Sequence, residues 1–401
     1  MAELKIQQDI PKGWVVKKMD DFINEGAISL GRGEVISKED IKNFPGENPI
    51  YSSSVKNNGL FGRYAKNMFD QELITWSVDG GGDFFYRPRH KFSVTNVSGY
   101  MNVDEKEFDY KFLAYYLQEE HSKKFFDYQH KAHPSVIREL YVVAKPPIKE
   151  QQKIAEILGT VDEEIAKTQE VIEATEKLKR GLMQQLFTRG IGHTKFKETE
   201  FGRIPDEWEV KELKDVSIKI GDGLHGTPEY SDGSEYYFIN GNNIYERGIK
   251  IYPETKKISV EQHQLHKKEL TSRSILLSIN GTIGNIGFYR GEKVALGKSI
   301  AYINCDDEIN KEFVAYQLET QRIYKYFAKE LTGTTIKNLS LGTIRQMPVF
   351  VPKKEEQQRI ANILSTIDEK ISVNKKLKEK FTLLKKGLMQ DLLSGRVRAK
   401  L

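Results

Sequence analysis

The strongest constraint on this chain is an internal repeat. The segment EQQKIAEILGTVDEEI (150–165) returns 206 residues later as EQQRIANILSTIDEKI (356–371), with 11 of 16 positions identical. The same offset aligns LKRGLMQQL (178–186) with LKKGLMQDL (384–392). Because a repeat in sequence indicates a repeated supersecondary unit, we expect two closely similar elements, one in each half of the chain.

The two halves also begin alike. The segment IPKGWVVKKMDDF (10–22) matches IPDEWEVKELKDV (204–216), and Trp14 and Trp208 are expected to pack into the cores. Since this offset is 194 and the later one is 206, the second half holds 12 additional residues between the matched segments. The halves therefore share their ends and differ in their middles, as a constant frame around two different inserts would.

The repeated segments are predicted to form two long helices of coiled-coil type. Their apolar residues recur at steps of three and four, Pro147 and Pro352 precede them, and Gly190 and Gly395 follow them. A helix of about 40 residues outgrows its own domain and needs a long partner, and the other copy is the obvious one. From periodicity alone, ordinary core helices of two separate domains remain an alternative. The expected helix-seam and partner-binding positions are Ile154, Leu158, Val161, Ile165, Leu182, Ile360, Leu364, Ile367, Ile371 and Leu388.

The charge balance argues against a strongly basic, stand-alone nucleic-acid binder. The chain has 62 Lys and Arg against 57 Asp and Glu, a formal net charge of +5. Residues 353–401 hold 13 basic and 6 acidic side chains, which leaves the remainder close to neutral. If DNA is the ligand, a partner is therefore expected to add affinity.

Cysteine usage and hydropathy place the chain in a broad class. The single cysteine, Cys305, excludes intramolecular disulfides and a zinc site with several cysteines. No signal-type apolar segment and no run of about 18 apolar residues occurs, so we expect a soluble, cytoplasmic protein without membrane contact.

The inserts are predicted to be mixed α/β domains with many short strands. In the second insert, RSILLSINGTIGNIGFYR (273–290) alternates apolar stretches with glycines, and ELITWSVDGGGDFFYRPRH (72–90) occupies the same place in the first. A helix follows in each, from Phe112 and from Phe313. The expected fold class is α+β, with two α/β domains separated by two long antiparallel helices as a pseudo-twofold internal repeat. The expected limits are 1–146 for the first domain, 147–192 for the first long helix, 193–351 for a linker and the second domain, and 352–401 for the second long helix.

Taken in order, the motifs resemble one known family. They are the IPxxW start, the segments GDGLHGTPEY, FINGNNI, GTIG and TGTTIKNLS, the first insert's PIYSSSVKNNGLFGRY (49–64), and the duplicated EQQ helix start. Over nearly the whole chain, this pattern resembles the specificity (S) subunits of type I DNA restriction-modification enzymes. The resemblance implies that each insert is a target recognition domain for one half of a bipartite double-stranded DNA site. It also implies that the helices set the gap between the halves and bind two methyltransferase (M) subunits, and that restriction (R) subunits dock on the assembly.

Polar and basic loop residues are the candidates for DNA contact, because amide, guanidinium and hydroxyl groups recognise base edges and phosphates. For any one of them, a solvated turn residue is the commoner interpretation, so the segments carry more weight than the individuals. The candidates in the first insert are Ser52, Ser53, Ser54, Lys56, Asn57, Asn58, Arg63, Arg87, Arg89, His130, Lys131 and His133. Those in the second are His225, Thr227, Asn240, Asn242, Asn243, Lys298, Thr334, Thr335, Lys337 and Asn338.

Sequence signals for chemistry are weak. Gly221, Gly223 and Gly226 form a GxGxxG, but the residues after it are typical of a loop, whereas a dinucleotide site needs a helix there. Asp206, Glu209 and Lys211 mimic a compressed nuclease signature that the first copy lacks. We therefore predict no catalytic residue, metal site or cofactor on this chain. S-adenosylmethionine, ATP and magnesium are expected on the partner subunits, for methylation of adenine at N6 and for cleavage.

Two other classes of function compete with DNA recognition. A protein-interaction scaffold with two adhesive domains on a coiled-coil rod is favoured by the nearly neutral inserts. A nuclease or methyltransferase in its own right is disfavoured by the missing motifs, although a site assembled by folding would escape a motif search.

Overall fold

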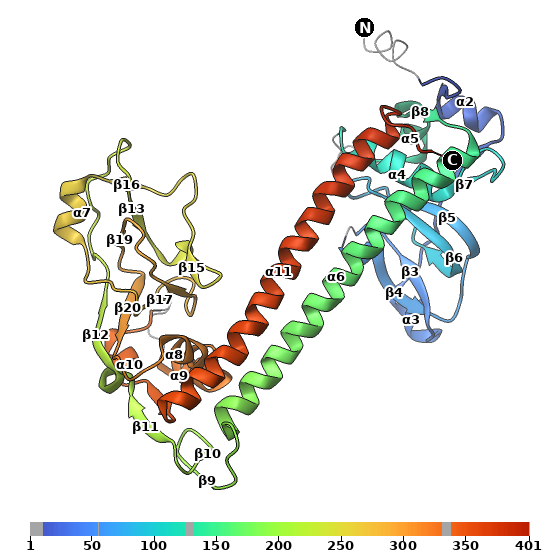
Figure 1. Ribbon diagram of the computed structural model, residues 1–401. Coiled ribbons are helices and arrows are strands. Elements are labelled where there is room, and N and C mark those ends of the chain that lie inside the picture. The colour runs from blue at the N-terminus through green and yellow to red at the C-terminus, as the bar shows by residue number, and fades with distance from the viewer. Residues whose placement is uncertain (1–10, 55, 125–130, 331–337, 401) are drawn as a thin grey trace. The chain divides into compact units, whose positions relative to one another are not determined.

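The computed structural model describes residues 11–54, 56–124, 131–330 and 338–400. It divides into two compact units, which we call unit 1 (residues 1–170 and 375–401) and unit 2 (residues 171–374). The two long helices, α6 (Ile148–Arg189) and α11 (Lys354–Leu393), each pass from one unit into the other (Figure 1). Each unit therefore combines one insert with a part of both helices.

Unit 1 is built on a six-stranded mixed sheet with the strand order β2-β7-β5-β6-β3-β4. Neighbouring strands are antiparallel except β3 and β6, which are parallel. The strands are β2 (Ile28–Arg32), β3 (Asn48–Tyr51), β4 (Leu60–Tyr64), β5 (Phe69–Ser77), β6 (Phe84–Val94) and β7 (Ser98–Val103). Gly99 on β7 lies under the indole of Trp76, where an added Cβ would come within 2.1 Å of the ring.

Helix α4 (Tyr110–His121) packs against β5 and β6 and begins at Asp109, whose carboxylate caps it by accepting from the amide of Phe112. Its buried face joins the main core of unit 1, which also includes Trp14, Trp76 and Ile154. A two-stranded antiparallel ribbon, β1 (Val15–Lys18) with β8 (Val142–Lys145), connects the start of the insert to its end. The remaining short helices of unit 1 are α2 (Met19–Asn24), α3 (Lys38–Asn43) and α5 (Pro134–Leu140), and η1 (Lys56–Gly59) is a turn with non-helical residues at its centre.

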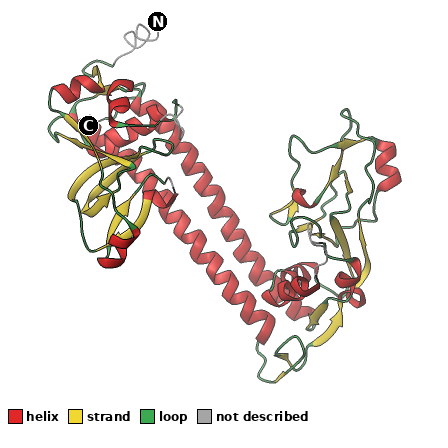
Figure 2. Ribbon diagram, turned by 180° about the vertical axis from the view of Figure 1, so that it is seen from behind, coloured by secondary structure: helices red, strands yellow, loops and turns green. Residues whose placement is uncertain are grey.

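Unit 2 repeats the outer parts of this plan and differs in the middle. The ribbon β11 (Glu209–Glu212) with β21 (Pro348–Val351) is the counterpart of β1 with β8. Between these two ribbon strands, the chain forms a four-stranded sheet, β12-β20-β17-β18, and a three-stranded sheet, β16-β13-β19 (Figure 2). Their strands are β12 (Ser217–Asp222), β13 (Tyr236–Ile239), β16 (Lys257–Ile258), β17 (Ser274–Ser278), β18 (Ile286–Phe288), β19 (Val294–Leu296) and β20 (Ile300–Cys305).

Smaller elements complete unit 2. Two short antiparallel pairs are β9 (Phe196–Lys197) with β10 (Ile204–Pro205), and β14 (Ile244–Tyr245) with β15 (Gly248–Ile249). The helices are η2 (Leu213–Val216), η3 (Gly241–Asn243), α7 (Val260–His266), α8 (Lys311–Leu318), α9 (Gln321–Glu330) and α10 (Leu341–Arg345). Strands β17 and β20 are buried at every position, because they lie in the middle of the sheet with its core on both faces.

The long helices are antiparallel, as predicted. In unit 1, Asp162 contacts Lys385 at 2.6 Å and Gln169 accepts from Lys378 at 2.8 Å, so seven residues forward on α6 correspond to seven backward on α11. In unit 2, Lys179 pairs with Asp368 at 2.7 Å. The helices end one and two residues before the glycines that were expected to stop them, Gly190 (φ +60°) and Gly395 (φ +74°), which adopt the left-handed conformation common after a helix C-terminus.

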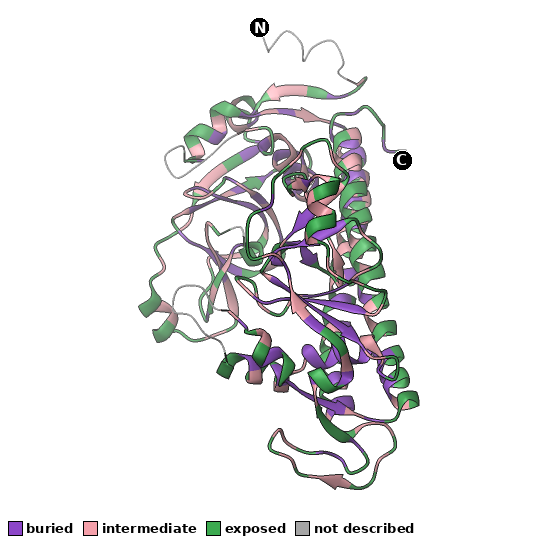
Figure 3. Cartoon of the chain, turned by 90° about the vertical axis from the view of Figure 1, so that its left-hand side faces the viewer, coloured by how far each residue is buried: buried purple, intermediate pink, exposed green. Residues whose placement is uncertain are grey.

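Burial along the long helices varies with position. Buried and exposed residues alternate along both of them (Figure 3). The first turns are buried against their own insert, with Ile154 and Leu158 at 0 % exposure in unit 1 and Ile360 and Leu364 at 0 % in unit 2. Within the described ranges, none of the helices has the length and apolarity needed to span a membrane.

Candidate nucleic-acid interface

Two of the predicted contact segments of unit 1, residues 52–58 and 131–133, converge with residues 78–83 around the end of β5. The hydroxyl of Ser77 donates to the carbonyl of Ser53 at 2.8 Å, and the amide of Ala132 donates to the carbonyl of Val78 at 3.0 Å. The ammonium of Lys131 lies 3.1 Å from the carboxylate of Asp79. We call the described residues of segments 52–58, 78–83 and 131–133 loop cluster 1.

The tip of loop cluster 1 has an unusual backbone. Asn57, Asn58 and Gly59 follow one another with φ values of 49°, 53° and 80°. Left-handed conformations disfavour most side chains, and asparagine and glycine tolerate them best. Both asparagine side chains are exposed while Gly59 is buried, so this turn presents two amides to solvent from a fixed base.

Arg87 lies beneath this turn and is 1 % exposed. Its guanidinium stacks 3.6 Å from the ring of Tyr51 and donates through Nε to the hydroxyl of Thr75 at 2.9 Å. An added Cβ on Gly59 would be 3.0 Å from its Nη2. Burial lowers the pKa of Arg87 to about 10. The expectation that Arg87 itself contacts DNA is therefore corrected: its guanidinium is enclosed, and it supports the turn from below.

The remaining candidates of the first insert are exposed or partly exposed. Ser52 accepts from the hydroxyl of Thr95 at 2.9 Å, Arg63 donates to the carbonyl of Glu47 at 2.7 Å, and His133 caps α5. Arg89 lies on the solvent side of β6. The exposed or partly exposed candidates are Ser52, Ser53, Ser54, Lys56, Asn57, Asn58, Arg63, Arg89, Lys131 and His133. His130 lies outside the described residues.

The candidate segments of unit 2 also come together. The amide of Leu224 donates to the carbonyl of Leu296 at 2.7 Å, and the hydroxyl of Ser299 donates to the side chain of Asn240 at 2.9 Å. Asn338 forms a β-bridge with Asn280. We call segments 223–227, 240–243, 297–299 and residues 280 and 338 loop cluster 2.

Asn243 is the second correction. It is 4 % exposed, and its amide nitrogen donates to the carbonyl of Lys250 at 2.9 Å and to the hydroxyl of Thr255 at 3.1 Å. Its side chain therefore holds the turn that follows β13 and does not face solvent. The candidates with exposed or partly exposed side chains are His225, Thr227, Asn240, Asn242, Lys298 and Asn338, while Thr334, Thr335 and Lys337 lie outside the described residues.

The GxGxxG segment is a loop, as the residues after it predicted. Strand β12 ends at Asp222, and the segment that follows is not helical. An added Cβ on Gly223 would lie 2.2 Å from the carbonyl oxygen of Leu296, so glycine is needed here for the close approach of two backbones. Asp222 pairs with His225 at 2.6 Å within the same loop.

The first two residues of the EQQ motif anchor each insert to its helix. Trp14 donates through Nε1 to Glu150 at 3.2 Å, and Trp208 donates to Glu356 at the same distance. The next glutamine, Gln151 in unit 1, accepts from the backbone at residue 109 and donates to the carbonyls of residues 107 and 146. Gln357 accepts and donates in the same way in unit 2, at residues 310 and 352. The repeat thus records a structural requirement, and both tryptophans are in the cores as predicted.

A second repeated contact joins the insert to both long helices, and sequence reasoning missed it. In unit 1, the hydroxyl of Tyr115 donates to Asp162 at 2.6 Å, and Lys385 lies 2.6 Å from the same carboxylate and 5.2 Å from the tyrosine ring. We call this group joint 1. The alignment of FLAYYLQEE with FVAYQLETQ already placed the two tyrosines at equivalent positions, and that was the available signal.

Joint 2 is the equivalent group in unit 2. Tyr316 donates to Asp368 at 2.7 Å, and Lys179 lies 2.7 Å from that carboxylate and 5.3 Å from the ring. Arg247 adds to it: its Nη2 is 2.5 Å from Glu319, its Nε is 3.3 Å from Asp368, and its guanidinium is 3.9 Å from the ring of Tyr316. Burial, more than any charge, raises the pKa of Tyr316 above its ordinary range.

A tight hairpin turn brings Arg247 into joint 2. The turn between β14 and β15 contains Glu246 and Arg247, with φ values of 45° and 58°. Positive φ at both central residues is the mark of a type I′ turn, which matches the twist of a two-residue hairpin. The turn belongs to the insert, so joint 2 ties the insert directly to the long helices.

The predicted helix-seam residues occupy two environments. Ile154 and Leu158 lie in the core of unit 1, where Val161 is also buried, and Ile360, Leu364 and Ile371 are buried in unit 2. Ile165, Leu182, Ile367 and Leu388 are partly buried. Several seam positions thus pack on the inserts as well as on the facing helix.

Comparison with known proteins agrees with this architecture. A family model described as the type I restriction modification DNA specificity domain matches residues 11–176 and 205–383. The chain is 29 % identical to the type I restriction enzyme MjaVIII specificity subunit of Methanocaldococcus jannaschii, over 98 % of this chain and 94 % of that protein. It is 37 % identical to the type I restriction enzyme MpnII specificity subunit of Mycoplasma pneumoniae, over 32 % of this chain and 39 % of that protein.

Two solved structures share the fold. One is the type I restriction-modification S subunit from M. genitalium, with a TM-score of 0.62 and 19 % identity over 96 % of this chain and 97 % of that one. The other comes from work on complex assembly and conformational transition of the type I restriction-modification system, with a TM-score of 0.56 and 13 % identity over 97 % of this chain and 100 % of that one. The predicted fold class, two mixed α/β domains with two long antiparallel helices, is confirmed. With both of its halves matched by the family model, the chain belongs to the type I restriction-modification DNA specificity family.

Proposed function

We propose that this chain is the non-catalytic DNA-recognition subunit of a type I restriction-modification enzyme. Each insert would recognise one half of a bipartite site in double-stranded DNA. The observation that carries the proposal is the frame repeated in both units, on which two different loop clusters are displayed. A single frame with unlike loops is what two unlike half-sites require.

Loop clusters 1 and 2 supply the appropriate chemistry. Asn57, Asn58 and Asn242 expose carboxamides, which can pair with adenine through one acceptor and one donor, and Lys56 and Lys298 expose ammonium groups suited to phosphates. The clusters have few cations, in keeping with the nearly neutral inserts. Partner subunits would therefore supply much of the salt-dependent affinity.

The long helices are the proposed docking surface for two methyltransferase subunits. Val171 and Leu178 on α6 are 41 % and 55 % exposed, and the residues 206 positions later, Leu377 and Leu384 on α11, are 39 % and 49 % exposed. Exposed apolar side chains repeated at equivalent positions suit two copies of one partner. Those subunits would bind S-adenosylmethionine and methylate adenine at N6, and restriction subunits with ATP and magnesium would cleave. The assembly would act in the cytoplasm on the cell's own and on foreign DNA.

Mapping N6-methyladenine across the host genome, with and without this gene, tests the proposal. Loss of one bipartite motif, two short specified halves around a fixed unspecified gap, is the expected result. An unchanged map in a strain that expresses the chain and an active methyltransferase would refute it and favour a protein-interaction scaffold. Measuring the affinity of the chain for DNA at rising salt concentration is a second test. Contacts to phosphates weaken steeply as salt rises, whereas apolar contacts to a protein partner do not.

A second experiment tests the role of the helices. Inserting seven residues at facing positions of α6 and α11 adds about 10 Å of helix, which corresponds to about three base pairs. The expected product is a methylated motif with a longer gap and unchanged half-sites. Changed half-sites with the original gap would contradict this role.

A further inference from the structure

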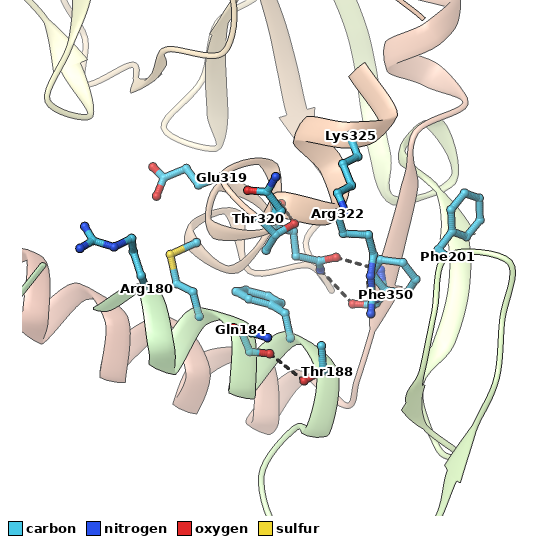
Figure 4. Close-up of a pocket in the computed structure, with 13 residues that line it drawn as sticks. Arg180, Gln184, Thr188, Phe201, Glu319, Thr320, Arg322, Lys325 and Phe350 are labelled. Atoms are coloured by element: carbon cyan, nitrogen blue, oxygen red, sulfur yellow. Dashed lines mark hydrogen bonds between the residues drawn. The ribbon is translucent and has the colours of Figure 1, made fainter. Parts of the chain in front are cut away.

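A cavity of about 600 Å³ in unit 2 lies between the C-terminal part of α6 and the start of α9 (Figure 4). Its apolar wall is made by Met183, Phe187 and Phe350, which are 9 %, 3 % and 2 % exposed. This volume is within the range of cavities that hold small ligands or anchoring side chains of a partner. Loop cluster 2 contributes no residue to it, so the proposed DNA contacts leave it unused.

Three cations line the cavity without a carboxylate partner in the described part of the chain: Arg180 from α6, and Arg322 and Lys325 from α9. Arg322 stacks 4.4 Å from the ring of Phe350 and donates through Nη2 to the carbonyl of Arg203, while its Nη1 is buried and has no partner among the described residues. Burial lowers the pKa of Arg322 below its ordinary value.

The carboxylate that lines the cavity does not neutralise these cations. Glu319 is engaged in joint 2, where it lies 2.5 Å from Arg247 and 3.4 Å from Lys179. The cavity therefore combines an apolar wall with surplus positive charge. Its complement is a ligand with an anionic group next to an apolar group.

Unit 1 repeats only part of this set: Lys386 and Lys124 correspond to Arg180 and Lys325, but Arg322 and its two preceding neighbours are replaced. At the offset of 201 residues that aligns the two insert helices, Thr320, Gln321 and Arg322 correspond to Glu119, Glu120 and His121. The ring of His121 contacts the hydroxyl of Tyr141 at 3.0 Å and the carbonyl of Gly81 at 2.5 Å, so it is already used inside the insert. Unit 1 thus has two carboxylates where unit 2 has Thr320 and Gln321, and one of them, Glu120, pairs with Lys123 at 2.6 Å.

We propose that this cavity anchors a segment of the methyltransferase subunit in which an Asp or Glu stands beside an apolar side chain. The inference rests on the proposed function for the identity of the partner. Arginine and aromatic residues are enriched at the centres of protein interfaces. On α6 the lining residues Arg180, Met183 and Phe187 lie on the face opposite Leu178, so the anchor would be a contact separate from the exposed apolar residues of that helix. DNA phosphate would use the cations and would leave the buried aromatic wall without a role.

A consequence is that the two methyltransferase positions differ. One subunit would gain the anchor in unit 2, and the other would dock on unit 1 without it. Binding of the two copies is then stepwise, with one tighter site.

Charge reversal at two exposed positions tests the anchor. The double variant Arg180→Glu/Lys325→Glu leaves the apolar wall intact, and both residues are exposed, so the fold is preserved. Titration of the full chain with its methyltransferase, followed by native mass spectrometry and calorimetry, should show the tighter site weakened about tenfold or more and the other site unchanged. Lys386→Glu is the matched control, because Lys386 is the equivalent of Arg180 in the repeat; it should leave both sites unchanged.

The other outcomes are distinct. Wild-type affinity in the double variant, or equal loss with Lys386→Glu, would overturn the anchor and leave the proposed function standing. Weaker DNA binding with unchanged methyltransferase binding would instead identify a phosphate site, and dissociation of a self-associated chain would identify a second copy as the occupant; both would overturn the proposal. If the wild-type chain binds no methyltransferase, the proposed function itself fails.

Discussion

The two joints predict an order of stabilities that can be measured. Asp162 in joint 1 and Asp368 in joint 2 accept from equivalent tyrosines and pair with equivalent lysines. Only Asp368 also faces Arg247, at 3.3 Å. Replacing each aspartate by asparagine keeps the size of the side chain and removes its charge, so the pair Asp162→Asn and Asp368→Asn isolates the electrostatic contribution of each joint.

The expected loss in unfolding free energy for each variant follows from how buried the joint is and from which charges lose their partner. In joint 1 the side chains of Lys385 and Asp162 are 26 % and 38 % exposed, so water replaces much of the lost pairing and we expect a loss of about 1 kcal/mol. In joint 2, Lys179 and Arg247 are 18 % and 17 % exposed, and Asp368→Asn leaves these two cations with Glu319 alone. Partly buried charges without a partner are costly, so the expected loss is about 2–3 kcal/mol.

Hydrogen exchange detected by mass spectrometry is the suitable assay, because it reports opening free energies separately for unit 1 and unit 2. Asp162→Asn should accelerate exchange in unit 1 and Asp368→Asn should accelerate it more strongly in unit 2. Lys153→Gln, which breaks an exposed pair with Glu156, is the control and should cost under about 0.5 kcal/mol. An Asp368→Asn loss no larger than that of Asp162→Asn, or no larger than the control, would refute the reasoning.

Three further predictions concern single sites. Burial and the hydrogen bond to Asp162 raise the pKa of Tyr115. The hydroxyl therefore stabilises the fold fully below the ordinary tyrosine pKa of about 10, and this stabilisation is lost as the pH rises above that value. Tyr115→Phe should differ less from wild type in unfolding free energy at pH 11 than at pH 8. Burial raises the pKa of Cys305 to about 12, so a thiol reagent at pH 8 should modify the native chain at the rate at which unit 2 opens, and fast labelling of the native chain would contradict its enclosure. Gly181→Ala and Gly387→Ala should each stabilise the free chain by about 0.5–1 kcal/mol, because an added Cβ meets nothing within 4 Å and alanine favours the helix. Denaturant unfolding measures this, and a less stable variant would contradict the open space seen at these two positions.

The frame could be predicted from the sequence because its signals are local or repeated. Proline, glycine and apolar periodicity fix the helix ends, and the antiparallel partner follows from helix length and duplication. The joints lay within reach, since Tyr115 and Tyr316 already align in the repeat. The role of Arg247 could not be predicted, because it depends on where a two-residue hairpin in one insert meets a helix distant in sequence.

The burial of Arg87 shows why individual contact residues could not be predicted. Arg87 and Arg89 are two positions apart, so a regular strand would place them on the same face. In the structure, Arg87 pairs with Leu73 and His90 pairs with Gln71, so β6 has one more residue than β5 over this stretch. This bulge reverses the alternation and turns Arg87 inward while Arg89 stays exposed. Bulges depend on tertiary packing and leave little trace in the local sequence.

The contacts divide the residues of each unit into two sets. Attachment to the long helices uses Trp14, Glu150 and Gln151 with joint 1 in unit 1, and their repeated equivalents with joint 2 in unit 2. The exposed amides and cations lie on the loop clusters, where none takes part in attachment. A change of loop sequence can therefore alter recognition without loosening the insert from its helices, provided that the residue beneath the loop keeps its partners. In unit 2 this separation is incomplete, because Arg247 belongs to the insert and to joint 2 at once. Replacing that hairpin would disturb attachment as well as the insert, so unit 1 should accept foreign inserts more readily than unit 2.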